Sequence, residues 1–372
     1  MRRLVVVLAA LALQPSAAAA ASPTVDARAY LVENTATGEI LAQHAAATPV
    51  PIASITKLMT VLVTLEHVRP TDVVTVPIAG VGAGGSSIHL RAGERLTVRD
   101  LLKGALIQSA NDAADTLAAW VGGGDVQRFV ALMNAKAREL GLRDTHFVRP
   151  DGLDAPGHVS SARDVLKLAQ VAMHLKAVRS IVREKTDVIA GDRQLHTWND
   201  LLGVFPGLFG VKTGHTSGAG WCEVAAVRRP GYTIYAVILG SPNRAQRNAD
   251  LATLLRFGVS RYKLVSLLTR GRVYARTQIG YGRPPLALVS KQPLVRVVRV
   301  GRPLVERVVS PGAVALPVAA GQRLGRVEIW TGGKLIGMRP LVAAKPVTRP
   351  GLRARIGYYG RRTIHHVWSF IS

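Results

Sequence analysis

The chain contains a single cysteine, Cys222, among its 372 residues. It therefore cannot form an intramolecular disulfide, and a hydrophobic core must stabilise the fold unaided. A hydrophobic content of 48% is enough for a sizeable core, and the length predicts two domains. Cys222 lies in the strand-like run WCEVAAV, which predicts a buried structural thiol rather than a reactive one.

The apolar run near the N-terminus is too short to cross a bilayer. Arg2 and Arg3 precede the apolar residues 4–13, and an alanine-rich stretch ending at Ala21 supplies A-x-A cleavage sites. This pattern is typical of a secretory signal peptide over residues 1–21, outside the folded part. No cysteine stands at the cleavage point, so a lipid-modified signal is not expected. We expect an exported protein, in the periplasm or peripheral on the outer face of the cytoplasmic membrane.

Acidic residues are scarce in the last third of the chain. Residues 261–372 contain 21 of the 48 Lys and Arg but only 2 of the 23 Asp and Glu. Such asymmetry predicts contact with a polyanion. An exported protein meets anionic lipid and anionic wall polymers before nucleic acid, so we expect no nucleic-acid partner.

Residues 22–262 alternate short strand-like runs with amphipathic helices, which indicates a mixed α/β (α+β) domain. Residues 29–33 and 38–42 form a predicted hairpin. Two capping boxes, Thr97 with Asp100 and Ser161 with Asp164, mark helix starts. Gly141 is placed to end a helix that begins near residue 126. Late strands are expected at 220–227 and 232–239.

The pattern of residue types changes at about residue 263. Short β-branched runs punctuated by Gly and Pro, with a hairpin turn at Gly332 and Gly333, predict a small all-β domain over 263–345. Residues 346–372 form a basic C-terminal segment. From 352 onward its apolar residues follow a helical stripe while Arg353, Arg361 and Arg362 face away, which favours a helix lying on an anionic membrane surface. A tail without that role, disordered or packed on the domain, is the alternative, because three glycines weaken the helix.

The stretch PIASITKLMT, residues 51–60, places a hydroxyl and an ammonium in an apolar run. Ser54 precedes a helix whose start favours negative charge, and Lys57 follows one turn later within reach of the hydroxyl. A desolvated lysine has a lowered pKa and can act as a base, which serine needs to become a nucleophile. By itself S-x-x-K is a weak signal, because an N-cap serine and a surface lysine would look the same.

Two further motifs strengthen the interpretation of S-x-x-K as a catalytic motif. Ser109-Ala110-Asn111 directly follows the capped helix, and Lys212-Thr213-Gly214 opens a predicted strand in GVKTGHTSGAGWCEVAAV. S-x-x-K, S-x-N and K-T-G in this order, on helix, loop and strand, form the motif set of serine penicillin-recognising acyl transferases.

With these motifs, residues 25–260 resemble the low-molecular-mass penicillin-binding proteins, the serine-type D-alanyl-D-alanine carboxypeptidases of the peptidase S11 family. PIASITKLMT, LLKGALIQSANDAADTLA, DGLDAPGHVSSARDVLKLA and GVKTGHTSGAGWC carry the resemblance. It implies a β-lactamase/transpeptidase-like catalytic domain of antiparallel sheet with helices, followed by a small all-β domain. Two positions depart from relatives: Ala110 replaces a common glycine, and Trp198 replaces a basic residue and could alter how the peptide is held.

The resemblance also implies a mechanism on peptidoglycan stem peptides, with β-lactams as covalent inhibitors. Ser54 would attack the bond between two terminal D-alanines, Lys57 would take its proton, Ser109 would relay a proton to the leaving amine, and Asn111 would hold Lys57 and the substrate amide. Lys212 and Thr213 would bind the free carboxylate, Gly214 would allow close approach, and the N–H groups of Ser54 and His215 would form the oxyanion hole. No metal or cofactor is implied. The histidines without ligand spacing are expected to be surface or structural: His44, His89, His146, His158 and His174.

Three alternatives remain at this stage. A class A β-lactamase also needs a glutamate in E-x-x-L-N, and the corresponding stretch here reads RPDGLDAPGHVSS. A catalytically idle wall-binding scaffold has no need of Ser54 or Lys57. A D,D-endopeptidase would use the same machinery, so the sequence leaves carboxypeptidase and endopeptidase open.

Overall fold

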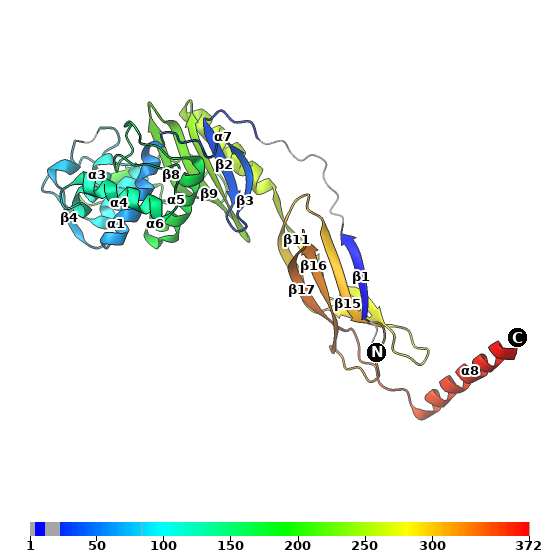
Figure 1. Cartoon of the computed structure of the whole chain (residues 1–372). Coiled ribbons are helices and arrows are strands. Elements are labelled where there is room, and N and C mark those ends of the chain that lie inside the picture. The colour runs from blue at the N-terminus through cyan, green and yellow to red at the C-terminus, as the bar shows by residue number, and fades with distance from the viewer. Residues whose placement is uncertain (1–3, 12–22, 83, 372) are drawn as a thin grey trace. The chain divides into compact units, whose positions relative to one another are not determined.

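The protein divides into two compact units (Figure 1). The computed structural model describes residues 4–11, 23–82 and 84–371. The mixed unit comprises Ala21–Ser260, and the β unit combines Arg261–Ser372 with the strand β1, Leu4–Leu11. The sequence placed the corresponding domain limit after residue 262. The expected class, a mixed α/β domain followed by an all-β domain, is confirmed.

A five-stranded antiparallel sheet organises the mixed unit, in the order β3-β2-β10-β9-β8. The predicted hairpin is present as β2, Ala29–Asn34, and β3, Glu39–His44. The other strands are β8, Leu208–Thr216; β9, Gly220–Arg229; and β10, Tyr232–Ser241. Short strand pairs lie outside this sheet: β4, Val73–Thr75, with β5, Arg95–Thr97; and β6, Thr186–Ile189, with β7, Arg193–His196.

Helices cover both faces of this sheet, which explains why its central strands β9 and β10 are buried over most of their length. On one face, Tyr235, Val237 and Leu239 of β10 join the main core with α5, Ala162–His174. On the other face packs α7, Arg244–Ser260, where a Cβ at Gly258 would lie 2.7 Å from the Ile234 side chain. The remaining helices are α1, Lys57–His67; α2, Val98–Lys103; α3, Asn111–Val121; α4, Val126–Glu139; and α6, Lys176–Ile181.

The predicted helix signals form as expected. Thr97 Oγ1 accepts a hydrogen bond from the Asp100 N–H at 3.1 Å, and Ser161 Oγ accepts one from the Asp164 N–H at 3.2 Å. Gly141, with φ of +64°, follows α4 and its Leu140 cap. Each cap satisfies a backbone group that the helix itself leaves unpaired.

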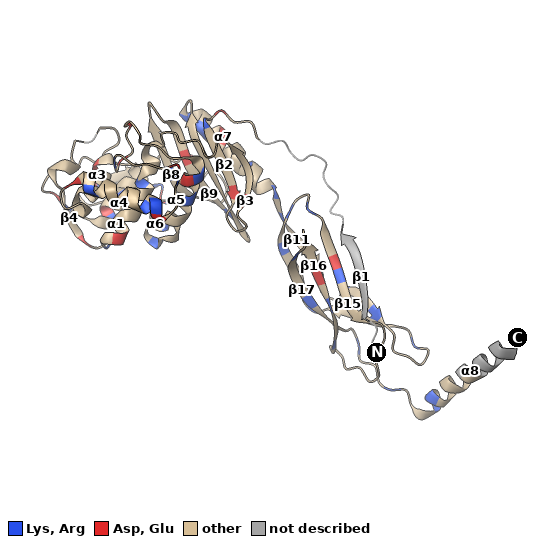
Figure 2. Ribbon diagram, viewed as in Figure 1, with Lys and Arg blue, Asp and Glu red and all other residues tan. Residues whose placement is uncertain are grey.

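The β unit is built on a six-stranded sheet, β1-β15-β16-β17-β13-β12, and a two-stranded one, β11-β14. Gly332 and Gly333, both with positive φ, form the predicted turn between β16, Arg323–Thr331, and β17, Lys334–Ala343. The other strands are β11, Tyr262–Leu268; β12, Val273–Thr277; β13, Leu286–Ser290; β14, Leu294–Arg299; and β15, Leu304–Pro311. Basic residues are spread over this unit, and acidic ones are rare (Figure 2).

The predicted signal segment was expected to lie outside the fold. In the full-length chain its residues 4–11 form β1, which pairs antiparallel with β15 along the edge of the β unit's sheet. An apolar, β-branched run can pair with any open strand edge, so this position agrees with its composition. Cleavage of residues 1–21 stays a prediction.

The C-terminal segment is helical over α8, Leu352–Ile371. Three apolar side chains of its first turns are exposed, Leu352 at 70%, Ile356 at 64% and Tyr359 at 51%. Within the described part of the chain, no helix is both long and apolar enough to cross a membrane.

Replacing Ser161 with alanine should destabilise the mixed unit by about 1 kcal/mol, because the start of α5 loses its cap while the hydroxyl's site stays buried. Thermal unfolding of the full chain should show a midpoint lower by about 2–4 °C. Ser180→Ala is the matched control, since this exposed hydroxyl bonds only its own helix. Equal midpoints for the two variants would contradict the assignment.

Candidate active site

Ser54 lies in a 3₁₀ turn, η1, Ala53–Thr56, that leads into α1. The sequence predicted the start of a helix, and the tighter turn comes just before it. Ala53 has φ of +50°, a costly conformation for a residue with a Cβ, so surrounding packing must hold it. A Cβ at Gly214 would lie 2.9 Å from the Ser54 nitrogen, and one at Gly152 would lie 2.2 Å from the Ala53 oxygen. These glycines let two neighbouring segments close on the serine turn.

Lys57 is fully buried beneath this turn. Its Nζ donates hydrogen bonds to Ser54 Oγ at 2.8 Å, Asn111 Oδ1 at 2.7 Å and the Asp151 carbonyl at 2.6 Å. Burial lowers the pKa of Lys57 from 10.5 to about 8, while the carboxylates of Asp151 and Asp115 oppose the shift. A lysine with this pKa is partly neutral near pH 8 and can accept a proton from a neighbouring hydroxyl.

The S-x-N residues follow a π-helical turn, η3, Gly104–Gln108. Ser109 adopts φ of +64° there, and Asn111 begins α3. π-turns of this kind often occur at functional sites, because they redirect side chains at a helix end. Asn111 Nδ2 donates to the Gly84 carbonyl, which turns its oxygen toward Lys57. Ala110 is fully buried in the main core.

The K-T-G residues lie on β8, at the edge of the sheet. The sequence placed them at the start of a strand, but β8 begins earlier, at Leu208, so Lys212 sits within it. Lys212 is buried, and its Nζ donates to Ser109 Oγ and to the Thr213 carbonyl, each at 2.8 Å. Burial and, to a smaller degree, the charge of Lys57 lower the pKa of Lys212 well below its usual value, and Glu223 opposes them. The three motifs, far apart in sequence, therefore meet at one place.

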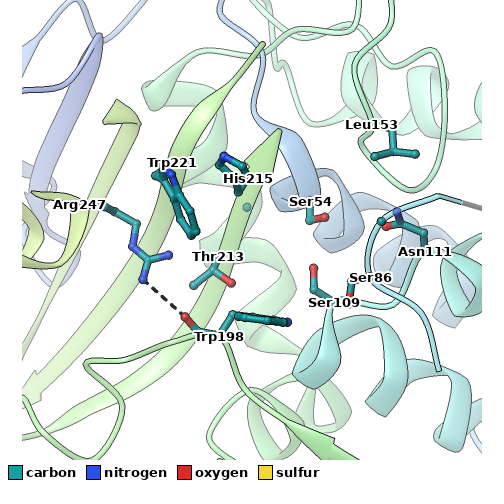
Figure 3. A pocket seen from close by; sticks show the side chains of 12 residues that line it. Ser54, Ser86, Ser109, Asn111, Leu153, Trp198, Thr213, His215, Trp221 and Arg247 are labelled. Atoms are coloured by element: carbon teal, nitrogen blue, oxygen red, sulfur yellow. Dashed lines mark hydrogen bonds between the residues drawn. The ribbon is translucent and has the colours of Figure 1, made fainter. Parts of the chain in front are cut away.

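They border a cavity of about 270 Å³ (Figure 3). The hydroxyls of Ser54, Ser109 and Thr213 are grouped on the two sides of this space, and His215 lies next to Ser54. The volume is near the lower end of the range for small-molecule sites. The lining residues are Ser54, Gly85, Ser86, Ser109, Asn111, Leu153, Trp198, Thr213, Gly214, His215, Trp221 and Arg247.

Arg247 was not identified from the sequence, although it lines this pocket. Its side chain is only 1% exposed, with Nε 3.2 Å from Glu223 Oε2. Burial raises the pKa of Glu223 to about 7, against the opposing charge of Arg247. A signal was present: Arg247 shares the buried stripe of α7 with Leu251 and Leu254, where an arginine is unusual.

Aromatic side chains form one wall of the pocket. Trp198 Nε1 donates to the Gln108 carbonyl at 3.0 Å, and the Arg244 guanidinium lies 5.2 Å from its ring. Trp221 stacks on His215 with 4.1 Å between ring centroids. Trp198, flagged as a departure from relatives, therefore lies where it can contact a bound peptide.

No metal centre emerges from the described residues, where groups of three or more His, Cys, Asp or Glu are absent. His158 has a structural position. It accepts from the Val148 N–H at Nδ1, so its Nε2 donates to Thr56 Oγ1 at 2.8 Å. Burial lowers the pKa of His158 to about 4. Cys222 is buried, as predicted, and burial raises the pKa of its thiol to about 11.

The chain matches two family models. Residues 16–243 match "D-alanyl-D-alanine carboxypeptidase", and residues 262–349 match "Penicillin-binding protein 5, C-terminal domain". It is 32% identical to the D-alanyl-D-alanine carboxypeptidase DacD of Salmonella typhimurium. The alignment covers 91% of this chain and 90% of that protein. It is 29% identical to the D-alanyl-D-alanine carboxypeptidase DacF of Bacillus subtilis, in an alignment that covers 87% of this chain and 86% of that protein.

Solved structures agree. Penicillin-binding protein 5 of Haemophilus influenzae is 27% identical, with a TM-score of 0.64 over 88% of this chain and 99% of that one. The DD-transpeptidase of Streptomyces K15 is 32% identical, with a TM-score of 0.61 over 64% of this chain and 99% of that one. The chain therefore belongs to the peptidase S11 family, the low-molecular-mass penicillin-binding proteins that act as serine-type D-alanyl-D-alanine carboxypeptidases.

Proposed function

We propose that Ser54 carries this activity as an acyl-enzyme that removes the terminal D-alanine from peptidoglycan pentapeptide stems. The observation that supports it is the 2.8 Å hydrogen bond from buried Lys57 to Ser54 Oγ. As the hydroxyl attacks the carbonyl between the two D-alanines, unprotonated Lys57 takes its proton. Asn111 and the Asp151 carbonyl keep the amine aimed at Ser54 throughout.

The tetrahedral oxyanion is stabilised by the backbone N–H groups of Ser54 and His215. The close approach of β8 at Gly214, where a side chain would collide with the Ser54 nitrogen, supports this arrangement. Donors already aimed at the developing charge need no reorganisation, which makes such a site a large part of catalysis. Ser109, hydrogen-bonded to Lys212, relays a proton to the departing D-alanine amine. Water then hydrolyses the ester.

Recognition of the free chain end draws on two cations. The sequence assigned the substrate carboxylate to Lys212 and Thr213. Because burial lowers the pKa of Lys212, its full charge depends on an anion nearby, which the substrate carboxylate supplies. Arg247, also buried at the pocket, adds a second positive charge near Thr213.

The alternatives fit the site less well. A β-lactamase needs a carboxylate free to activate water, but in the loop facing Lys57 the Asp151 carboxylate is paired with Arg149 and the Leu153 N–H. A scaffold would not need the Ser54–Lys57 pair. Endopeptidase activity would use the same groups, so we propose removal of terminal D-alanine as the main reaction. Mass spectrometry of products from pentapeptide and cross-linked muropeptides distinguishes the two.

Penicillin should form one covalent adduct on the chain, and peptide mapping should place it on Ser54. Ser54→Ala should abolish the adduct, because among the described residues Ser54 carries the one hydroxyl bonded to Lys57. Ser86→Ala is the matched control: Ser86 lines the same pocket, but its hydroxyl is bonded to the Gln108 carbonyl. An adduct that survives in Ser54→Ala would refute the assignment.

The rate of acylation by penicillin should increase with pH up to about 8, the pKa of Lys57. Burial lowers this pKa, so the reactive neutral amine predominates above it, and protonation removes the base below it. The rate should decrease about tenfold per pH unit on the acidic side. Stopped-flow acylation with the wild-type protein measures the profile. A rate that stays constant from about pH 6 to about pH 9 would show that Lys57 is not the base.

We further infer that the protein is exported and held peripherally at an anionic membrane surface by residues 351–372. The exposed apolar side chains of α8 and its exposed arginines Arg353, Arg355 and Arg361 support this location. Basic residues near an anionic surface contribute about 1 kcal/mol each. The basic β unit then joins the membrane segment to the catalytic unit.

Truncation after Pro350 should release the protein from anionic vesicles without changing its turnover of small peptides. Co-sedimentation of full-length and truncated forms tests this. Full-length protein carrying Arg353→Gln, Arg355→Gln and Arg361→Gln should bind these vesicles more weakly, which separates the charges from the apolar stripe. Equal binding by full-length and truncated forms would rule the anchor out.

A further inference from the structure

A second cavity, of about 340 Å³, lies at the sheet face that α5 covers. Phe209 of β8, Arg228 of β9 and Tyr235 of β10 line it from the sheet, and Arg179 lines it from α6. Among the described residues it shares none with the Ser54 pocket. The other lining residues are Thr35, Gln170, Met173, His174 and Thr233.

Two guanidinium groups line this cavity, the exposed Arg228 and the half-buried Arg179, and each has donors that make no hydrogen bond to the described residues. Arg228 lies over Phe209, with its guanidinium carbon 4.9 Å from the ring centroid, and stacking sets the plane of the group. Arg179 donates twice from Nη1, to the Met173 carbonyl at 2.8 Å and the His174 carbonyl at 2.7 Å, at the end of α5. Its Nε and Nη2 donors remain for a ligand.

A tyrosine hydroxyl completes the cavity. Tyr235 is only 6% exposed, and its hydroxyl has no hydrogen-bond partner among the described residues. Both Arg228 and Arg179 act on this phenol, opposing the burial that raises its pKa to about 12. The Tyr235 oxygen is not one of the fully buried, unpartnered polar atoms of the described residues, so it is reachable through the cavity and can donate to a bound acceptor.

The charge of the lining is one-sided. Within the described part of the chain, the cavity is lined by Arg179 and Arg228 and by no Asp or Glu. Glu33, which faces Tyr235 across β2 and β10, accepts instead from Gln170 Nε2 at 3.0 Å. Two like charges held at one cavity repel each other, and a bound anion would relieve that repulsion.

We propose that this cavity binds a small anion, a carboxylate or a phosphate, through Arg179, Arg228 and the Tyr235 hydroxyl. A guanidinium pair matches the planar oxygens of either group. A ligand with its own ammonium fits poorly, because no lining carboxylate can accept it. Free D-alanine is therefore not the ligand, whereas an N-acylated amino acid, as in a wall peptide, or a phosphate group is. This site goes beyond the proposed reaction and does not depend on it.

Calorimetric titration of the full chain in a buffer without carboxylate or phosphate tests the site. N-acetyl-D-glutamate, inorganic phosphate and D-alanine are the probes. Either N-acetyl-D-glutamate or inorganic phosphate should bind with a stoichiometry near one, and the probe that binds shows whether the natural ligand is a peptide carboxylate or a phosphate. D-alanine should not bind. Arg228→Gln should weaken binding about tenfold or more, and Tyr235→Phe about threefold to tenfold.

Arg256→Gln is the matched control, because this exposed arginine of α7 loses the same charge on the other side of the sheet. It should leave probe affinity unchanged. Acylation by penicillin should be normal in all three variants, which shows that they fold. Failure of both anionic probes to bind wild-type protein at millimolar concentration would overturn the proposal. So would unchanged affinity in Arg228→Gln, or equal affinity for D-alanine.

Discussion

The burial of Lys57 is the constraint on which the rest of the catalytic unit depends. A charged lysine is expensive to bury, and here three acceptors receive its hydrogen bonds while a lowered pKa lets it exist uncharged. Each acceptor comes from a different part of the chain: Ser54 from η1, Asn111 from the start of α3 and Asp151 from a loop. The Lys57 amine therefore links these three segments through hydrogen bonds and fixes them relative to one another.

The same low-polarity surroundings also hold a second cluster of charges. Lys212, Glu223 and Arg247 are all buried on β8, β9 and α7, and burial shifts the pKa of Lys212 down and that of Glu223 up. The protonation of Lys212 and Glu223 therefore responds to neighbouring charges. In the proposed mechanism a neutral Lys57 acts as the base while a charged Lys212 binds the substrate, and the two amines can differ in charge because they have different partners.

The β unit depends on local sequence more than the mixed unit does. Its strands need only alternating apolar and polar residues joined by turns, so glycine pairs such as Gly332 and Gly333 determine locally which strands pair. With only two acidic residues beyond residue 260, its surface keeps a strong positive charge. The mixed unit lacks such an excess of positive charge, which agrees with the proposed location of the membrane-binding segment in the basic part of the chain.

The sequence by itself determined the three motifs, the capping boxes, the hairpins and the division into a mixed and a β part, because these depend on local spacing and composition. It also predicted the Lys57–Ser54 contact, since residues three apart meet on one turn. Only the tertiary structure placed Arg247 and the Asp151 carbonyl at the site and assembled the second cavity around Tyr235. Those contacts join residues distant in the chain, and no local pattern records which buried polar groups will meet once the sheet has formed.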